Sequence, residues 1–292
     1  MTFEHGISSL HIIESVGEVD GEPGRALHER LLKTPGQFSG LPIHVHKVLG
    51  ESDLNSIMEA IFQGEASKGM TPILHFEVHG NNSEFCLRNG SRIPWIVFGQ
   101  QLARFNLATR FNLLVVFSCC NGYQQIDALD AFRVCPFTAL VSCVGTISTA
   151  ELLDGFVAFY RTLATDRLIT KAVRDMKAAI KSGTTAEFGL VSAARMFRSV
   201  VEAIYRENRD PEYLRDKKRE LRRQAELKNA LNGILTPISD ADAERAFQES
   251  LDRTIRQHYT QFFALNEIPE NAETFPFEDL VTNVRRRIEA GG

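Results

Sequence analysis

The sequence predicts an α/β fold built on a mostly parallel sheet with helices on both faces, followed by a helical C-terminal extension. Short, almost wholly apolar runs alternate with amphipathic helical segments, which is typical of parallel strands buried on both faces. Two of these runs, Pro72–Gly80 and Phe111–Cys120, end in a reactive side chain close to a glycine turn. Because ligands of open α/β sheets bind at the carboxyl ends of strands, we expect the working groups at that edge.

The N-terminal part is predicted to contain two strands joined by a short helix. Ser9–Val16 is rich in β-branched and apolar residues, as strands usually are. The turn-rich segment Gly17–Gly24 then leads into a helix over Arg25–Lys33. Leu41–Val48 is predicted to be the second strand, since its proline stands near the strand start, where it is tolerated.

A helix and a β-hairpin flank the strand Pro72–Gly80. The helix is capped by Ser52 or Asp53 and runs to about Gln63, because its apolar residues recur on one face. The hairpin spans Glu84–Trp95, since Asn-Gly between two short strands is the strongest local signal for a hairpin turn.

After the hairpin, helices and strands continue to alternate. Ser148 is predicted to cap one helix, because Glu151 completes a capping box three residues later. Phe188–Ala193 fits either a last strand or the start of a long helix, and we favour the helix. The other predicted segments are a helix over Ile96–Thr109, strands over Phe111–Cys120 and Phe137–Gly145, and helices over Ser148–Ala164 and Leu168–Lys181.

The character of the chain changes after about residue 196. Residues 206–229 carry dense charges of both signs, which indicates a solvated helix and not a nucleic-acid patch. Two further helices are predicted to begin at Ser239 and Phe277, on either side of a loop over Pro269–Pro276. We therefore expect two domains, residues 1–184 and 185–292. The second would be a lid, a partner-docking surface or an oligomerisation element, and it could pack on the same core.

Composition and charge argue against several classes of protein. The apolar content of 43% and the charged content of 24% are ordinary for a soluble globular protein, and a net charge of −4 gives no reason to expect nucleic-acid binding. No apolar stretch approaches the roughly 18 residues of a membrane span, and no signal-peptide pattern stands at the N-terminus. We expect a cytoplasmic protein that binds neither nucleic acid directly nor a membrane.

The five cysteines predict neither a disulfide framework nor a metal site. Their number is odd, and without a secretory signal they are expected to be reduced. No Cys-x-x-Cys is present, so no zinc site is predicted. His44, His46 and His75 lie inside predicted strands, where histidines are more often structural than ligands. No metal or other cofactor is expected.

One cysteine and one histidine stand out as a candidate dyad. A nearby imidazole favours the thiolate, which is the nucleophilic form of cysteine. Cys120 precedes Asn-Gly and His79 precedes Gly80, so the chain can turn directly after each. Alternation along a strand puts Cys119 and Cys120 on opposite faces. Taken alone, Cys120 would be read as another buried cysteine, but its pairing with His79 favours it as the nucleophile, with Cys119 as a buried filler.

These motifs resemble those of the caspase-like cysteine peptidases (the caspase–hemoglobinase clan), and most closely those of the bacterial CHAT-domain peptidases. The resemblance covers roughly residues 8–183. It rests on four segments in the same order as in the family, namely Leu74–Gly80, Val115–Gly122, Thr138–Gly145 and Phe156–Leu163.

The resemblance implies a function and a catalytic apparatus. His79 would be the base, Cys120 the nucleophile, and the backbone N–H groups of Gly80 and Cys120 the oxyanion hole. A backbone carbonyl usually orients the histidine in this family, so no third catalytic side chain is expected. The protein would then be an endopeptidase acting through a thioester, regulated in bacterial stress or anti-phage responses. It would cleave a protein substrate and respond to an activating protein partner.

Substrate preference stays open at this stage. Glu77 shares a face with His79, so it could contact the substrate, tune His79 or pair with an arginine. Relatives with basic specificity carry an acidic residue two places before the nucleophile, where this chain has Ser118. Asp127 or Asp130 could instead supply an acidic pocket wall, although loop carboxylates are usually just solvated.

The predicted hairpin could also line the substrate cleft, through Arg88, Arg92 and Trp95. The alternative function is a non-catalytic caspase-like interaction module, against which the presence of both His79 and Cys120 argues. A nucleotide-binding domain is disfavoured, because no glycine-rich phosphate loop follows the first strand.

Overall fold

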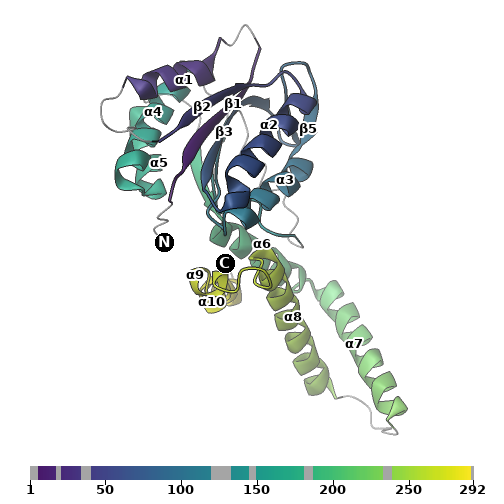
Figure 1. Cartoon of the computed structure of the whole chain (residues 1–292). Coiled ribbons are helices and arrows are strands. Elements are labelled where there is room, and N and C mark those ends of the chain that lie inside the picture. Colours follow the sequence, from purple (N-terminus) through teal and green to yellow (C-terminus); the bar gives the residue numbers. More distant parts are fainter. Residues whose placement is uncertain are drawn as a thin grey trace. The chain divides into compact units, whose positions relative to one another are not determined.

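The computed structural model describes residues 6–17, 21–33, 41–119, 133–144, 149–180, 187–232 and 239–290 (Figure 1). The chain divides into two compact units. The first comprises Met1–Asp130 with Cys135–Ala193, and the second comprises Ala131–Val134 with Ala194–Gly292. Within the described residues, no helix is both long enough and apolar enough to span a bilayer.

The first unit has the α/β architecture that the sequence predicts, with a mixed, mostly parallel sheet. Its strands are β1 (Ser9–Ser15), β2 (Ile43–Lys47), β3 (Pro72–Gly80), β4 (Glu84–Cys86), β5 (Arg92–Pro94), β6 (Leu114–Ser118), β7 (Ala139–Val144) and β8 (Glu187–Ser192). The main sheet has the order β2-β1-β3-β6-β7-β8, in which β8 alone runs antiparallel to its neighbour. The β4–β5 hairpin extends from β3, as the Asn-Gly turn predicts.

Helices cover both faces of this sheet (Figure 1). They are α1 (Pro23–Leu32), α2 (Glu51–Gly64), the short 3₁₀ helix η2 (Ala66–Lys68), α3 (Trp95–Ala108), α4 (Thr149–Asp166) and α5 (Ile169–Ala179). On one face, apolar residues of β1, β3, β6 and β7 pack against α1, α4 and α5. On the other face, Phe76 and Phe117 pack with Phe98 of α3. The central strands β1, β3 and β6 are buried on both sides, which explains their largely apolar sequences.

The helix favoured over Phe188–Ala193 is wrong, because the segment from Glu187 to Ser192 is the edge strand β8. It pairs with β7 from Cys143–Phe188 to Ala139–Ser192, and Phe188 packs 5.8 Å from Phe156, measured between ring centroids. A short apolar run has no periodicity that separates a strand from a buried helix. The segment forms a strand because the edge of β7 offers backbone N–H and C=O groups with which it pairs.

Of the predicted helix N-caps, one assignment is wrong, one is confirmed and one lies outside the described residues. Helix α2 begins at Glu51 with Gly50 as its N-cap, so the assignment of Ser52 or Asp53 is wrong. The Asp53 carboxylate instead accepts the Leu49 backbone N–H at 3.0 Å, just before the helix. Ser148 lies outside the described residues. At the start of α8, Ser239 is confirmed as the N-cap and accepts the Asp242 N–H.

In its described residues, the second unit is helical. Its helices are α6 (Ala193–Glu207), α7 (Pro211–Leu231), α8 (Asp240–Phe262), the single turn α9 (Asn271–Thr274) inside the predicted loop, and α10 (Phe277–Glu289). Aromatic rings of α6, α8 and the following turns form its core, where Phe197 lies 5.3 Å from Phe263 between centroids. Helix α7 is almost entirely exposed or half-buried, as the mixed charges predict.

Candidate functional site

The strand order places a change in the direction of the connections at the carboxyl ends of β1 and β3. From β1 the chain passes through α1 to β2 on one side, whereas from β3 it passes through the hairpin and α3 to β6 on the other. Neighbouring parallel strands whose connections diverge in this way form a topological switch point, where open α/β sheets bind ligands. The candidate site is therefore built on this edge of the first unit.

His79 and Gly80 are the last two residues of β3. The side chain of His79 is exposed, whereas the preceding residues of β3 are buried. His79 pairs with Cys86 in the antiparallel ladder, and Gly80 pairs with Phe85, so the hairpin holds the backbone at the end of β3. Cys86 is half-buried and donates weakly to the Leu87 carbonyl at 3.4 Å. The sequence did not single out this second thiol beside His79.

Strand β6 runs parallel to β3 up to the register pair Glu77–Ser118. Cys119 follows and is buried, as expected for a filler residue. Cys120 and Asp127, predicted as the nucleophile and as a substrate contact, lie outside the described residues. Asp130 does as well.

Glu77 is held by a buried polar chain that also contains His75 and Tyr160. Glu77 Oε1 lies 2.8 Å from His75 Nε2, and His75 Nδ1 lies 2.7 Å from the Tyr160 hydroxyl. An ionised carboxylate can only accept, so His75 donates through Nε2 and accepts the Tyr160 hydroxyl at Nδ1. Burial, followed by the charge of Glu77, raises the pKa of Tyr160 well above its usual value, which keeps that hydroxyl protonated. The structural role predicted for His75 is therefore to connect Glu77 to Tyr160 through hydrogen bonds.

Charged and polar side chains form a row across four strands at this edge. Lys47, Glu14, Glu77 and Ser118 are successive register partners from β2 to β6. Burial raises the pKa of Glu14, the Arg25 backbone N–H partly opposes this, and the charge of Glu77 adds to it. Within the described part of the chain, the buried Ser118 hydroxyl has no hydrogen-bond partner. The sequence did not single out Glu14, although a carboxylate near the end of an apolar strand was a visible signal.

A pocket of about 430 Å³ opens at the carboxyl ends of β1 and β2. Of the hairpin residues predicted to line a cleft, Arg88 lines this pocket. Arg92 donates to Glu84 at 2.7 Å, and Trp95 is fully buried and donates to the Asn81 carbonyl. Among the described residues, the pocket is lined by Glu14, Val16, Gly17, Gly21, Glu22, Lys47, Val48, Leu49 and Arg88.

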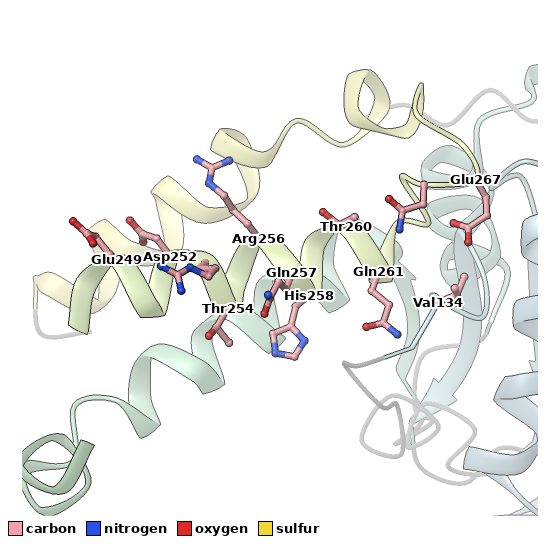
Figure 2. Close-up of a pocket in the computed structure, with 12 residues that line it drawn as sticks. Val134, Glu249, Asp252, Thr254, Arg256, Gln257, His258, Thr260, Gln261 and Glu267 are labelled. Carbon is pink, nitrogen blue, oxygen red and sulfur yellow. The ribbon is translucent and has the colours of Figure 1, made fainter. Parts of the chain in front are cut away.

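A second pocket, of about 1000 Å³, belongs to the helical unit (Figure 2). Most of its lining comes from α8, including Thr254, Gln257 and Gln261, with Val134 at one end. Among the described residues, its lining includes none of the predicted site residues. The switch-point edge of the first unit therefore remains the candidate site.

Comparison with known proteins adds no relative. No family model matches the chain, and no curated protein matches it significantly. Membership of the caspase-like peptidases is therefore a proposal.

Proposed function

We propose that the chain is a caspase-like cysteine endopeptidase that acts through His79 and Cys120. The observation that carries the proposal is the register of β3 and β6, which reaches the pair Glu77–Ser118. His79 follows Glu77 by two residues, and Cys120 follows Ser118 by two residues. Residues two apart on a strand share a face, so His79 lies on the face of Glu77. We propose that Cys120, which lies outside the described residues, follows the end of β6 at the corresponding sequence position.

The proposed reaction proceeds in two steps. His79 takes the proton of the Cys120 thiol, and the sulfur attacks the peptide carbonyl to give a tetrahedral oxyanion. The backbone N–H groups of Gly80 and Cys120 are proposed to stabilise that oxyanion, a contribution of about 3 kcal/mol for one such donor. The C–N bond then breaks, and the amine leaves with the proton from His79. Water, activated by His79, hydrolyses the thioester and restores the thiol.

Buried neighbours support the end of β3, where the base stands. The chain from Tyr160 through His75 to Glu77 anchors the face from which His79 emerges. The carboxylate of Glu77 is engaged with His75, which favours a positioning role for Glu77 over direct substrate contact. The Ser118 hydroxyl is buried and has no hydrogen-bond partner among the described residues, and its contact with the substrate stays a prediction.

The pocket beside Arg88 is proposed as the substrate-recognition subsite. It adjoins the switch point, and Arg88 and Lys47 bring positive charge to a wall that also carries Glu14 and Glu22. Glu22 is already paired with Lys47 by an ion pair. Arg88 lines this pocket and carries a positive charge, and we propose that it selects an acidic or hydrogen-bonding group of the substrate.

Regulation by a partner is proposed for the helical unit. On α7, Leu227 and Leu231 lie one helical turn apart and are 64% and 81% exposed. A partner protein that covers them would be the activating signal, in a stress or anti-phage response of a bacterial cell.

Cleavage of a diverse peptide library, followed by mass spectrometry, tests the proposal. The wild type should cleave, and Cys120→Ala and His79→Ala should each reduce cleavage by several orders of magnitude. Cys119→Ala and Cys86→Ala are the matched controls, since each removes a neighbouring thiol that is not in the proposed dyad. If Cys86→Ala reduced cleavage as much as Cys120→Ala, the thiol of Cys86 in the hairpin would have to be considered as the nucleophile.

Absence of cleavage by the wild type, alone and with candidate partners, would favour the non-catalytic interaction module. Arg88→Ala should leave the dyad intact but change which peptides are cleaved. The differences in KM that separate preferred from other peptides should become smaller. An unchanged cleavage profile would remove the recognition role of Arg88.

A further inference from the structure

Three histidines and a glutamate gather on the other face of the sheet, away from His79. His11 lies in β1, His44 and His46 lie in β2, and Glu65 follows α2. Along β1, Leu10 and Ile12 pack toward α1 and α4, so the alternating His11 faces the side that carries α2. The residues converge from three segments that are distant in sequence.

Their contacts form a compact polar cluster around His11. His11 Nε2 lies 2.8 Å from Glu65 Oε1, and His11 Nδ1 lies 3.0 Å from His46 Nε2. The rings of His11 and His44 stack with their centroids 4.9 Å apart. One ligand atom each from His11, His44 and Glu65 lies within 4.8 Å of the other two. Among the described residues, this is the group whose donors suit a metal ion.

We propose that His11, His44 and Glu65 bind a zinc ion or a similar divalent transition-metal ion. Two imidazoles and one carboxylate are a ligand set that zinc accepts, with water at the fourth position. His11 is buried, Glu65 is half-buried and His44 is exposed, so the ion would be open to solvent on the His44 side.

The required movement is small. Zinc bonds of about 2.0–2.2 Å separate tetrahedral ligands by roughly 3.4 Å, so the ligand atoms farthest apart, now within 4.8 Å, must close by about 1.4 Å at most. His11 Nε2 and Glu65 Oε1, now 2.8 Å apart, must separate by about 0.6 Å. His44 belongs to the edge strand β2 and is exposed, so a rotation of its side chain can supply this closure. The buried His11 can stay in place.

Outer contacts already orient two of the three ligands. The hydroxyl of Ser8 donates to Glu65 Oε2 at 3.1 Å, and the hydroxyl of Ser9 donates to the same oxygen, which leaves Oε1 directed at His11. In the ion-free structure His11 Nε2–H donates to Glu65 Oε1, so His11 Nδ1 accepts a hydrogen bond from His46 Nε2–H. When the ion binds, both rings would change tautomer, so that His11 Nδ1–H donates to His46 Nε2 and His11 Nε2 is free to bind the ion. Partners of this kind fix the tautomer and the orientation of metal ligands in known sites.

A bound ion would tie three parts of the first unit together. It would link β1 to the edge strand β2 and to the segment between α2 and η2. Because the ion would bind only the folded arrangement, zinc should raise the melting temperature. This inference stands apart from the proposed peptidase activity, because His79 stands near the carboxyl end of β3 and on the opposite face of the sheet from His11.

The test is a zinc titration against a chromophoric chelator, with Co²⁺ absorption as a second readout. It uses the full chain carrying His79→Ala and Cys120→Ala, so that the proposed dyad cannot bind the ion. We expect one ion per chain, a visible Co²⁺ spectrum typical of four or five ligands, and a higher melting temperature with zinc.

Ligand variants then locate the site. Ser9→Ala, which removes an outer contact, should weaken zinc binding about 10-fold, and His44→Ala should weaken it about 100-fold or more. Glu65→Gln should behave like His44→Ala. His28→Ala, which removes a half-buried histidine of α1, is the control and should leave binding unchanged.

Two results would overturn the proposal. One is failure of the parent chain to bind zinc at all. The other is stoichiometric binding that survives both His44→Ala and Glu65→Gln. Since His44 is exposed, its alanine variant should fold normally, and the melting temperature without metal verifies this.

Discussion

His75 donates through Nε2 to Glu77 over 2.8 Å, and both side chains are buried on the same face of β3. Removing the acceptor would leave a buried N–H without a partner, which costs about 1–3 kcal/mol. Glu77→Ala should therefore lower the free energy of unfolding of the first unit by that amount. Trp95, the sole tryptophan, lies in this unit, so denaturant unfolding followed by its fluorescence reports the change.

Tyr160→Phe removes the hydroxyl at the other end of the same chain and should cost about 1 kcal/mol, with the aromatic packing kept. The exposed Glu29→Ala is the control and should change the unfolding midpoint very little. If Glu77→Ala were as stable as the wild type, the polar chain would not support β3 as described.

Glu14 makes stability depend on pH. Its pKa is raised above the ordinary value of 4.5, first by burial and then by the charge of Glu77, with the Arg25 N–H opposing. The folded state therefore holds the proton more tightly than the unfolded state. Stability falls as the pH rises from about 4.5 through the raised folded pKa, and the penalty is complete above it.

Glu14→Gln removes this penalty and keeps an oxygen that can accept the Arg25 N–H. The variant should gain stability relative to the wild type at pH 8 and lose that advantage near pH 4. Unfolding midpoints at both pH values measure the difference. A constant difference between the two pH values would show that Glu14 does not titrate as inferred.

Asn106 is a buried polar hub between α3 and β7. Its amide donates to the Cys135 carbonyl at 3.0 Å, and its Oδ1 accepts the Thr138 hydroxyl at 3.0 Å and the Leu113 N–H at 3.3 Å. Asn106→Leu fills the space but satisfies none of these groups. It should lower the free energy of unfolding by at least about 2 kcal/mol in the same fluorescence experiment.

The matched control for Asn106 is Asn55→Leu, an exposed position on α2. It should change the unfolding midpoint far less. A similar effect of the two substitutions would mean that water satisfies the groups around Asn106.

Most of the fold could be predicted from sequence because the central strands are buried on both faces. Strand β6 is apolar up to Ser118, β3 is apolar apart from His75, Glu77 and His79, and the Asn-Gly turn defines the β4–β5 hairpin. The strand β8 could not be predicted in the same way, since its identity depends on the free edge of β7, a tertiary contact. The start of α2 was predicted wrongly for a local reason, because its N-cap is Gly50, which has no side chain that would mark the position in the sequence.

The candidate site was only partly predictable. His79 could be picked out because a glycine follows it at the end of an apolar strand. The partnership of Glu77 with His75 required the position of Tyr160, which is far away in the sequence. His11, His44 and Glu65 likewise come together only through strand register and the end of α2, and no spacing motif encodes them.

The central claim is that His79 activates the thiol of Cys120, and limited alkylation tests it without a known substrate or activator. The native protein is treated with a small amount of iodoacetamide near pH 6.5, and each cysteine is quantified by fragmentation mass spectrometry. A free thiol is about 1% ionised at that pH, whereas an imidazole-paired thiol is largely ionised.

The account predicts that Cys120 is alkylated first and that His79→Ala slows it about tenfold. Cys135 should remain unmodified, because burial raises the pKa of its thiol and hides it from the reagent. Cys86, half-buried beside His79 in the ladder, is the internal comparison. If Cys120 reacted no faster than Cys86, or if its rate were unchanged in His79→Ala, the proposed dyad would be contradicted.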